Sequence, residues 1–373
     1  MSRDLALVVG ANGLVGSCIA ARLAQRQRVI AVGRGPAREA MLALLAVERH
    51  VDEADHVKGP LQPLGALHLG RAQGLHAGVE YEDIDLSLDG ALQDLIETRR
   101  PADVIFAAGM TDVDACERDV TMAWQLNVRA VEEAALGCRE TGARLLSLST
   151  DYVFDGRNGP YAESDQPSPR GVYARTKRAG EEAALLLAPD CAVARVAAIF
   201  SGRRGAKKTF AVSVAQALRE GREVKAFHDQ IVSPTLADNA AALCIALLDS
   251  EAQGIVHCAG ADAVTRVEFC RTLARKLGAD DTLVVPVALA DLKLPAPRPL
   301  LCGLKVDLIR ELGGVPLSLE QALDLFLEEQ RASGQLPQAQ AQQAQQQQAR
   351  QHPPEQRESA PYGAPDAQPE TTR

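Results

Sequence analysis

A glycine-rich turn near the start of the chain separates a short apolar run from an amphipathic stretch. The apolar run is Leu5–Val9, the turn is Gly10-Ala11-Asn12-Gly13-Leu14-Val15-Gly16, and Val15–Arg26 has the periodicity of a helix. Glycine permits a tight strand-to-helix turn and a close approach of the backbone to a phosphate, and the helix N-terminus attracts the anion. The pattern therefore predicts a dinucleotide site formed by Gly10, Asn12, Gly13, Leu14, Val15 and Gly16.

Short apolar runs alternate with helical patterns through the first 200 residues. The predicted strands are Leu5–Val9, Val29–Val32, Val79–Ile84, Val104–Ala108, Leu145–Ser149 and Val193–Phe200. The predicted helices are Val15–Arg26, Ala91–Thr98, Met122–Glu140 and Arg175–Leu187. Apolar strands that alternate with helices are typical of a parallel sheet covered on both faces. We expect an α/β fold, a Rossmann-type doubly wound parallel sheet, with residues 1–200 as its NAD(P)-binding domain.

The remainder of the chain has a different pattern. The alternation weakens after Phe200, so we expect residues 201–331 to form a smaller C-terminal substrate-binding lobe over the carboxyl edge of the sheet. Residues 332–373 are rich in Gln and Pro and lack apolar surface, which predicts a disordered tail.

Residues 35–78 form an insertion between the second and third predicted strands. The insertion contains four of the seven histidines, His50, His56, His68 and His76. A metal site is one interpretation, but a spacing of six places His50 and His56 on different faces of a helix. We favour a solvated insertion and predict no metal site.

Composition argues against several classes of partner. The net charge is −9 and no basic patch is visible, which argues against nucleic acid. No apolar stretch reaches the roughly 18 residues of a membrane span. The N-terminus leads directly into a strand with no room for a signal peptide, so we expect a cytoplasmic protein. The eight cysteines include no C-x-x-C pair and are predicted to be buried apolar residues.

The ends of the predicted strands supply further candidates for cofactor contacts. The second strand ends at Gly33-Arg34, where a guanidinium suits a 2′-phosphate, so we favour NADPH over NADH. A solvated Arg34 is the alternative. Asp85 and Leu86 follow the third strand, and Asp85 is a candidate adenine contact or a capping residue. Ala107, Ala108 and Gly109 end the fourth strand with small side chains that would admit a ribose–nicotinamide or simply pack closely.

Three side chains are candidates for acid–base chemistry at a carbonyl. Tyr173 and Lys177 are four residues apart, so they share one face of a helix. A nearby ammonium would lower the tyrosine pKa from its usual value near 10 and favour proton transfer. Thr150 ends a strand and can donate to the substrate oxygen. An amphipathic surface helix would also contain Tyr-x-x-x-Lys, but the preceding Ser149-Thr150-Asp151-Tyr152 makes a chance match improbable.

These motifs resemble the extended short-chain dehydrogenase/reductase family, in particular its dTDP-4-dehydrorhamnose reductase branch, which includes the regulatory beta subunit of methionine adenosyltransferase. The resemblance covers roughly residues 5 to 328. It is carried by Gly10–Gly16, Ala107–Gly109, Val113–Glu117, Gln125–Val128, Ser149–Gly156, Tyr161–Glu163, Tyr173–Glu181 and Asp229–Thr235. The resemblance implies an NAD(P)H-dependent reductase of a nucleotide-linked 4-keto-6-deoxy sugar, with Thr150, Tyr173 and Lys177 catalytic and Asn127 beside the active site. It also implies a possible homodimer.

The chain departs from the family pattern in the substrate half. It has Arg195-Val196-Ala197-Ala198 where the sugar reductases carry Arg-Thr-Ser-Trp, and Leu301-Cys302 where they carry Asn and Ser. Loss of polar groups weakens binding of a sugar. Two alternatives therefore remain beside the sugar reductase. One is an NADP-binding regulatory or sensor subunit, and the other is a reductase or epimerase of a different ketone.

Overall fold

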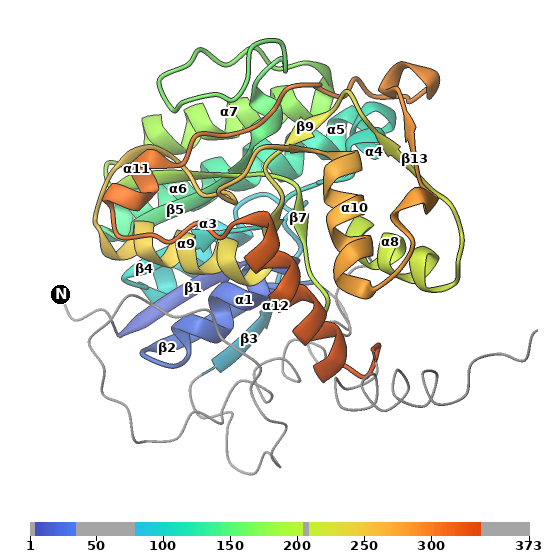
Figure 1. The fold of residues 1–373 in the computed structure, drawn as a ribbon. Coiled ribbons are helices and arrows are strands. Elements are labelled where there is room, and N and C mark those ends of the chain that lie inside the picture. Colours follow the sequence, from blue (N-terminus) through green and yellow to red (C-terminus); the bar gives the residue numbers. More distant parts are fainter. Residues whose placement is uncertain (1–3, 35–78, 204–208, 337–373) are drawn as a thin grey trace, which may run out of the picture. The chain divides into compact units, whose positions relative to one another are not determined.

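Seven parallel strands form the central sheet of the computed structural model, which describes residues 4–34, 79–203 and 209–336 (Figure 1). The strands lie in the order β11-β6-β5-β4-β1-β2-β3. Their bounds are β1 Leu5–Val9, β2 Arg28–Gly33, β3 Val79–Asp83, β4 Asp103–Phe106, β5 Arg144–Thr150, β6 Cys191–Val196 and β11 Gly254–His257. Every neighbouring pair is parallel, which confirms the predicted Rossmann-type sheet.

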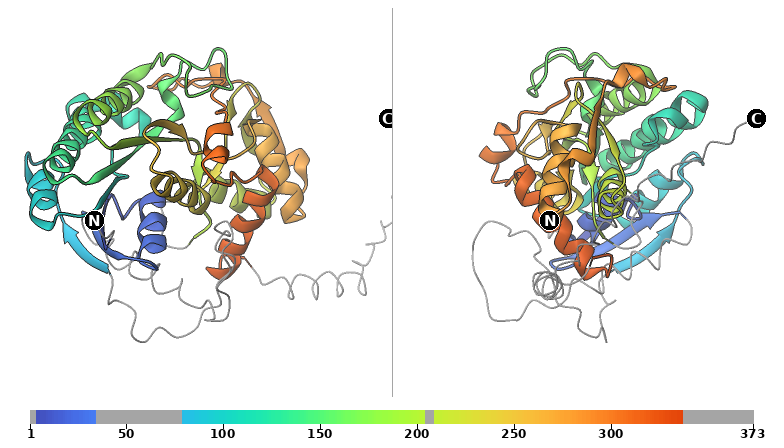
Figure 2. Two further views of the ribbon diagram at one scale, coloured as in Figure 1. Left: turned by 90° about the vertical axis from the view of Figure 1, so that its left-hand side faces the viewer. Right: turned by 45° about the vertical axis from the view of Figure 1, so that its right-hand side comes forward.

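Helices cover both faces of this sheet (Figure 2). On one face the core contains residues of α1 (Leu14–Leu23) and α9 (Ala237–Asp249). On the other face it contains residues of α3 (Ala91–Arg99), α6 (Ala130–Thr141) and α7 (Gly171–Leu187). All seven residues of β5 are buried, because the side chains of a strand alternate between the two faces of the sheet and helices cover both faces.

The strand expected over Val193–Phe200 is wrong as a single element. It divides into β6 and β7 (Ile199–Phe200), and β7 leaves the main sheet to pair with β10 (Thr235–Leu236). Ala198 between them has φ of 42°, in the left-handed region, so a continuous extended strand cannot pass through it. The break turns the chain away from the sheet toward its second half.

The helix expected over Met122–Glu140 is also interrupted. It consists of α5 (Val120–Trp124), a π-helical turn at Gln125–Arg129 and α6. Such turns are frequent at functional sites. Here the turn allows close packing, since a Cβ on Gly180 of α7 would collide with the carbonyl oxygen of Asn127.

The second half of the chain adds smaller elements. A helix α10 (Arg266–Leu277) packs against α8 (Phe210–Arg219), β8 (Val224–Phe227), β13 (Val284–Val287) and α12 (Leu319–Ala332). The ring of Phe200 meets those of Phe269 and Phe326 edge-on, with centroids 5.4 and 5.7 Å away. The remaining elements are α4 (Val113–Arg118), β9 (Ile231–Val232), β12 (Val264–Thr265), α11 (Asp307–Glu311) and the 3-10 turns Asp151–Val153, Asp281–Leu283 and Leu289–Asp291.

The expected domain boundary at residue 200 stays a prediction. The chain returns to the central sheet after this residue. Residues 237–257 form α9 and β11, and β11 pairs with β6 along the edge of the sheet. The chain divides into two units, residues 1–335 and 336–373, and everything described below lies in the first. The insertion 35–78, with its four histidines, and residues 337–373 of the expected tail lie outside the described residues.

Three expectations about the rest of the protein concern its cysteines, a metal site and the membrane. All eight cysteines are buried and free. In the described residues no group of three or more His, Cys, Asp or Glu side chains could hold a metal ion. Likewise, none of the described helices combines the length and the apolar character needed to span a bilayer.

Candidate active site

The predicted site residues gather at the carboxyl edge of the central sheet. Gly10 follows β1, Arg34 follows β2 and Ala107 follows β4. The register of β5 against β4 pairs Ser147 with Phe106, the last residue of β4, so β5 continues three residues further and ends at Thr150. In open α/β sheets ligands bind at this edge, and the longer β5 carries its last side chain out beyond the neighbouring strand.

The glycine-rich turn is a cradle with no space for a side chain at Gly10 or Gly16. Gly10 has φ of 82°, and a Cβ there would lie 2.6 Å from the backbone nitrogen of Ala108. A Cβ on Gly16 would strike the carbonyl oxygen of Gly10. Helix α1 then begins at Leu14, so its first N–H groups, which have no acceptor within the helix, are available to an anion.

The groups beside the cradle pair with each other. The guanidinium of Arg34 is 72 % exposed and forms an ion pair with Asp85, 3.1 Å between nitrogen and oxygen. Hydrogen bonds from Ser87, aided by Arg34, lower the pKa of Asp85. Leu86 is half-buried against the core. Tyr81 was not predicted from the sequence, and its hydroxyl accepts from the side-chain amide of Asn12 at 2.8 Å.

The small residues after β4 are packed closely by their surroundings. Ala107 and Ala108 lie against Gly10, and Gly109 lies against Asn127, where a Cβ would be 2.7 Å from the amide oxygen. That oxygen accepts from the N–H of Met110 at 2.8 Å, and the amide nitrogen donates to Thr176 at 3.0 Å. Asn127 therefore ties the loop after β4 to helix α7.

Helix α7 presents the other two candidate catalytic side chains beside Thr150. Both are buried, with Tyr173 9 % and Lys177 7 % exposed. The ammonium of Lys177 donates to the carbonyl oxygen of Leu148 on β5 at 2.7 Å. The ring of Tyr173 meets that of Tyr152 edge-on, with centroids 5.7 Å apart. The structure thus brings together the three side chains that the sequence singles out.

The expected effect of Lys177 on the tyrosine pKa is not what the structure shows. Burial raises the pKa of Tyr173, the neighbouring hydroxyl of Thr150 acts to lower it, and the charge of Asp151 raises it further. Burial also lowers the pKa of Lys177 to about 8, which the carboxylate of Glu181 partly offsets. The prediction counted the attraction between the two charges and omitted the larger cost of removing each from water.

Sequence reasoning did not assign a role to Asp151, although it named the motif that contains it. This carboxyl is 2 % exposed, its Oδ1 accepts from the hydroxyl of Thr150 at 3.0 Å, and its Oδ2 has no partner among the described residues. Burial raises the pKa of Asp151 to about 7. The site therefore contains an acid that is protonated or half-protonated near neutral pH.

A buried ion pair joins α7 to β6. The guanidinium of Arg195 on β6 makes two hydrogen bonds of 2.8 Å to the carboxylate of Glu181, which lies one turn after Lys177. Both side chains are almost completely buried. The Arg195 that opens the altered Arg-Val-Ala-Ala segment is thus structural in this protein.

Two segments from the second half close the site on its far side. Gln230 donates to the carbonyl oxygen of Pro299 at 3.1 Å, and Arg298 pairs with Asp114 of α4 at 2.8 Å. Leu301 donates its N–H to Gly156 at 2.9 Å. The thiol of Cys302 lies 3.6 Å from the carbonyl oxygen of Asp151. Both altered positions near residue 300 therefore lie against the Thr150–Gly156 segment.

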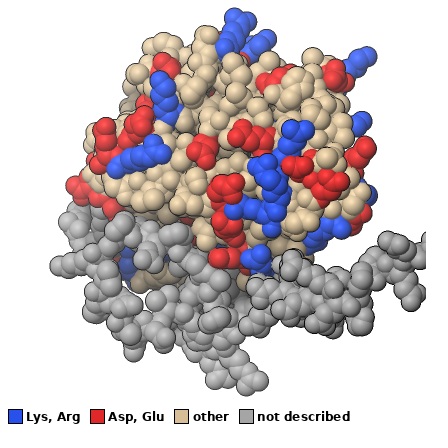
Figure 3. Space-filling model, viewed as in Figure 1, with Lys and Arg blue, Asp and Glu red and all other residues tan. Residues whose placement is uncertain are grey.

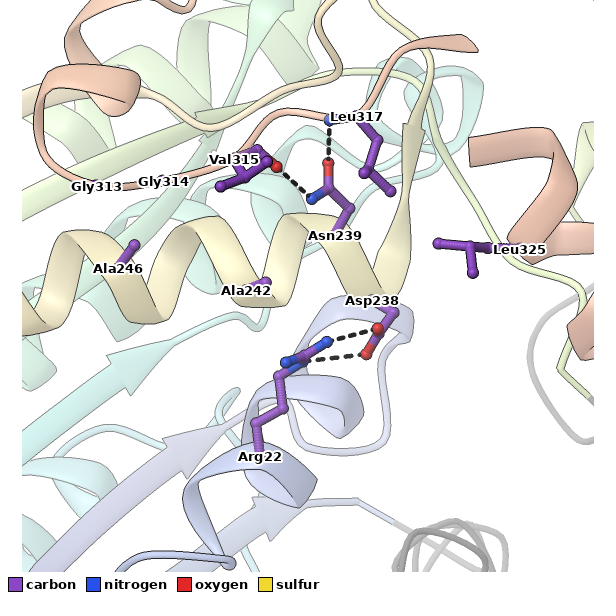
Figure 4. Close-up of a pocket in the computed structure, with 10 residues that line it drawn as sticks. All are labelled: Arg22, Asp238, Asn239, Ala242, Ala246, Gly313, Gly314, Val315, Leu317 and Leu325. Atoms are coloured by element: carbon purple, nitrogen blue, oxygen red, sulfur yellow. Dashed lines mark hydrogen bonds and ion pairs between the residues drawn. The ribbon is translucent and has the colours of Figure 1, made fainter. Parts of the chain in front are cut away.

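A small cavity of about 50 Å³ lies between α1, α9 and the loop before α12, away from these groups (Figure 4). It is lined by the ion pair of Arg22 and Asp238, by Asn239 and by apolar side chains. None of the predicted site residues lines it, so this cavity is not the candidate active site. On the face shown in Figure 3, Lys and Arg are interspersed with Asp and Glu.

The family described as the RmlD substrate binding domain matches residues 5–332. The chain belongs to this family. The resemblance inferred from the motifs is confirmed. A dTDP-4-dehydrorhamnose reductase of Mycobacterium tuberculosis is 40 % identical over 201 residues, which are 52 % of this chain and 66 % of that protein. The aligned part thus spans just under two thirds of that relative.

Other members match over more of their length. A probable low-salt glycan biosynthesis reductase of Haloferax volcanii is 31 % identical over 322 residues, 85 % of this chain and 95 % of that protein. Among solved structures, the dTDP-4-dehydrorhamnose reductase of Bacillus anthracis in complex with NADP superposes with a TM-score of 0.67 at 20 % identity, over 88 % of this chain and 99 % of that one. This likeness supports the fold of an RmlD-type protein.

Proposed function

We propose that this RmlD family member is an NAD(P)H-dependent reductase of a nucleotide-linked 4-keto-6-deoxy sugar. The observation that carries the proposal is the convergence of Thr150, Tyr173 and Lys177 beside the glycine cradle at one edge of the sheet. The curated relatives named as dTDP-4-dehydrorhamnose and dTDP-4-keto-6-deoxy-D-glucose reductases support the substrate class.

In the proposed reaction the ketone carbon gains a hydride and its oxygen gains a proton. A bound nicotinamide supplies the hydride. Thr150 turns its hydroxyl from Asp151 to the carbonyl oxygen and orients it by a hydrogen bond, and Tyr173 donates its phenolic proton to that oxygen. Lys177 stabilises the phenolate that remains, because its ammonium lies one helical turn from the ring. Burial keeps Tyr173 protonated until the oxygen develops negative charge, as a general acid requires.

We propose NADPH as the preferred form of the cofactor. Arg34 supports this choice, since its exposed guanidinium lies at the end of β2, where a ribose phosphate would reach it. Asp85 competes for the same guanidinium, so a 2′-phosphate would have to exchange with or share that ion pair. The homodimer and the cytoplasmic location remain predictions.

The decisive experiment compares wild-type protein with Tyr173→Phe for NADPH oxidation in the presence of dTDP-4-dehydrorhamnose. We expect turnover to fall by about 100- to 10,000-fold, the usual contribution of a general acid, with NADPH affinity unchanged. Tyr161→Phe is the matched control, because its buried hydroxyl bonds to Asp155 and not to the proposed reacting groups.

Two outcomes would contradict the proposal. Undiminished turnover in Tyr173→Phe would exclude this residue as the acid. Absence of turnover in the wild type despite NADPH binding would exclude the substrate and favour a sensor subunit or a reductase of another ketone.

A further inference from the structure

Arg266, the first residue of α10, is a half-buried cation at the substrate side of the site. Its Nε donates to the side-chain oxygen of Gln230 at 3.3 Å, and its Cζ lies 5.1 Å from the ring centroid of Phe210. Its backbone N–H also donates to the carbonyl oxygen of Gln230. These contacts hold the guanidinium in one place through a hydrogen bond and a cation–π contact, both of which leave its terminal nitrogens unused.

The partners of Arg266 connect it to the end of β5. Gln230 is 4 % exposed and donates to Pro299, which begins the segment that runs beside Asp151–Gly156. In agreement with this placement, the charge of Arg266 acts to lower the pKa values of Asp151 and Tyr152. Arg266 is therefore connected through Gln230 and Pro299 to the segment that follows Thr150.

The charge of Arg266 is not matched by an ion pair. Among residues 4–34, 79–203 and 209–336, no carboxylate oxygen lies within 4.0 Å of its guanidinium, whereas neighbouring Arg298 is paired with Asp114. The acid that acts on it, Asp151, is at most half ionised near neutral pH because burial raises its pKa to about 7. A half-buried guanidinium without a counter-ion favours an anionic ligand.

We propose that Arg266 binds a phosphate oxygen of the nucleoside diphosphate that the substrate carries. The inference rests on the proposed function for the class of ligand and names a residue that sets its specificity. Guanidinium nitrogens match phosphate oxygens in pairs, and the contacts with Gln230 and Phe210 orient those nitrogens before the ligand arrives. Arg266 acts on binding and not on the proton transfer.

The test titrates full-length protein with thymidine diphosphate and with thymidine by calorimetry, with NADPH present. We expect Arg266→Gln to weaken thymidine diphosphate by about 10- to 100-fold, with thymidine unchanged, as for one lost charge-assisted contact. Arg266→Lys should lose less, because the charge remains and only the paired geometry is removed. Arg271→Gln, an exposed change on the same helix, should bind as the wild type does.

Thermal unfolding of each variant shows whether it remains folded, and Arg266→Lys keeps the test informative if Arg266→Gln unfolds. The inference would be overturned if wild type, Arg266→Lys and Arg266→Gln bound thymidine diphosphate with equal affinity. The inference would also be overturned if Arg266→Gln weakened only the binding of a nucleotide sugar that carries a carboxylate on its sugar, because Arg266 would then bind that carboxylate. If the wild type fails to reduce any keto sugar but binds thymidine diphosphate through Arg266, the proposed function fails while this inference stands.

Discussion

The cofactor side and the substrate side of the candidate active site differ in how far backbone groups or side chains form them. The phosphate cradle on the cofactor side is backbone, since Gly10 and Gly16 leave no room for a side chain and the start of α1 presents N–H groups. The substrate side consists of side chains from separate parts of the chain, namely Asp151 after β5, Gln230 beside β9 and Arg266 on α10.

This difference shows how each side can change in evolution or design. Gly10 and Gly16 leave no room for substitution, because a Cβ on Gly10 would meet the main chain of Ala107 and Ala108 and a Cβ on Gly16 would meet the carbonyl oxygen of Gly10. A pocket of side chains can exchange one partner at a time while the sheet remains intact.

The largest expected effect is on the stability of the fold and concerns the buried ion pair between α1 and α9. Asp238 on α9 accepts two hydrogen bonds from Arg22 on α1 and lies 3.3 Å from Arg203, and the Arg22 pair is 6 % and 5 % exposed (Figure 4). Asp238→Asn would leave the buried guanidinium of Arg22 without a carboxylate, so we expect a loss of about 3–5 kcal/mol in unfolding free energy, measured in urea.

The same two helices supply the control for this change. Arg26 and Asp249 form a second ion pair with two hydrogen bonds between α1 and α9, but their side chains are 39 % and 40 % exposed. Asp249→Asn should cost less than about 1 kcal/mol. Equal losses for the two variants would show that burial does not decide the strength of these pairs.

The next effect concerns the cradle itself. Gly10→Ala combines a positive φ with a collision against the backbone of Ala108, whereas Gly90→Ala has φ of 86° and open space around the added methyl. We expect about 1–2 kcal/mol of destabilisation from the backbone conformation in both and about 1–3 kcal/mol more from crowding in Gly10→Ala. Calorimetric titration should show that only Gly10→Ala loses NADPH, and similar NADPH affinity in both variants would refute a crowded cradle.

On the substrate side we predict a pH effect from Asp151. Its pKa in the folded protein is raised from 3.8 to about 7, so its neutral form stabilises the fold below pH 4 and that contribution is lost as the pH rises toward 7. Asp151→Asn cannot ionise. Relative to the wild type, this variant should therefore gain about 2–3 kcal/mol of unfolding free energy between pH 5 and pH 8.

Urea unfolding of both proteins at the two pH values measures this difference, because all other titrating groups are common to them. A constant difference between the proteins would mean that Asp151 ionises in the fold as it does in water.

The smallest expected effect concerns the choice of cofactor. Arg34→Gln should weaken NADPH by about 10-fold and leave NADH unchanged, as for the loss of one exposed contact with a phosphate. The ion pair with Asp85 is exposed, so stability should change by less than about 1 kcal/mol. Arg28→Gln, an exposed change at the opposite end of β2, is the control. Equal losses for NADPH and NADH would remove Arg34 as the determinant.

Local sequence was enough to predict the cradle, most of the strands and the three candidate catalytic residues. Gly10–Gly16 and the apolar runs act over a few neighbours, where steric limits and periodicity decide the conformation. The seventh strand, β11, was missed because Gly254–His257 has only four residues and begins at a glycine, which is too short a run to show a periodicity. The break at Ala198 was missed because only pairing with β10 pulls β7 out of the sheet.

Tertiary structure alone decided the charge states and the substrate side of the site. The spacing of Tyr173 and Lys177 predicts that they share a helix face, but their pKa values depend on how completely the fold removes them from water. Nor can spacing predict that Arg266 lies near Asp151, more than 100 residues away in the chain. The physical reason is range: backbone sterics act between neighbours in sequence, whereas burial and charge act between whatever residues the fold makes neighbours in space.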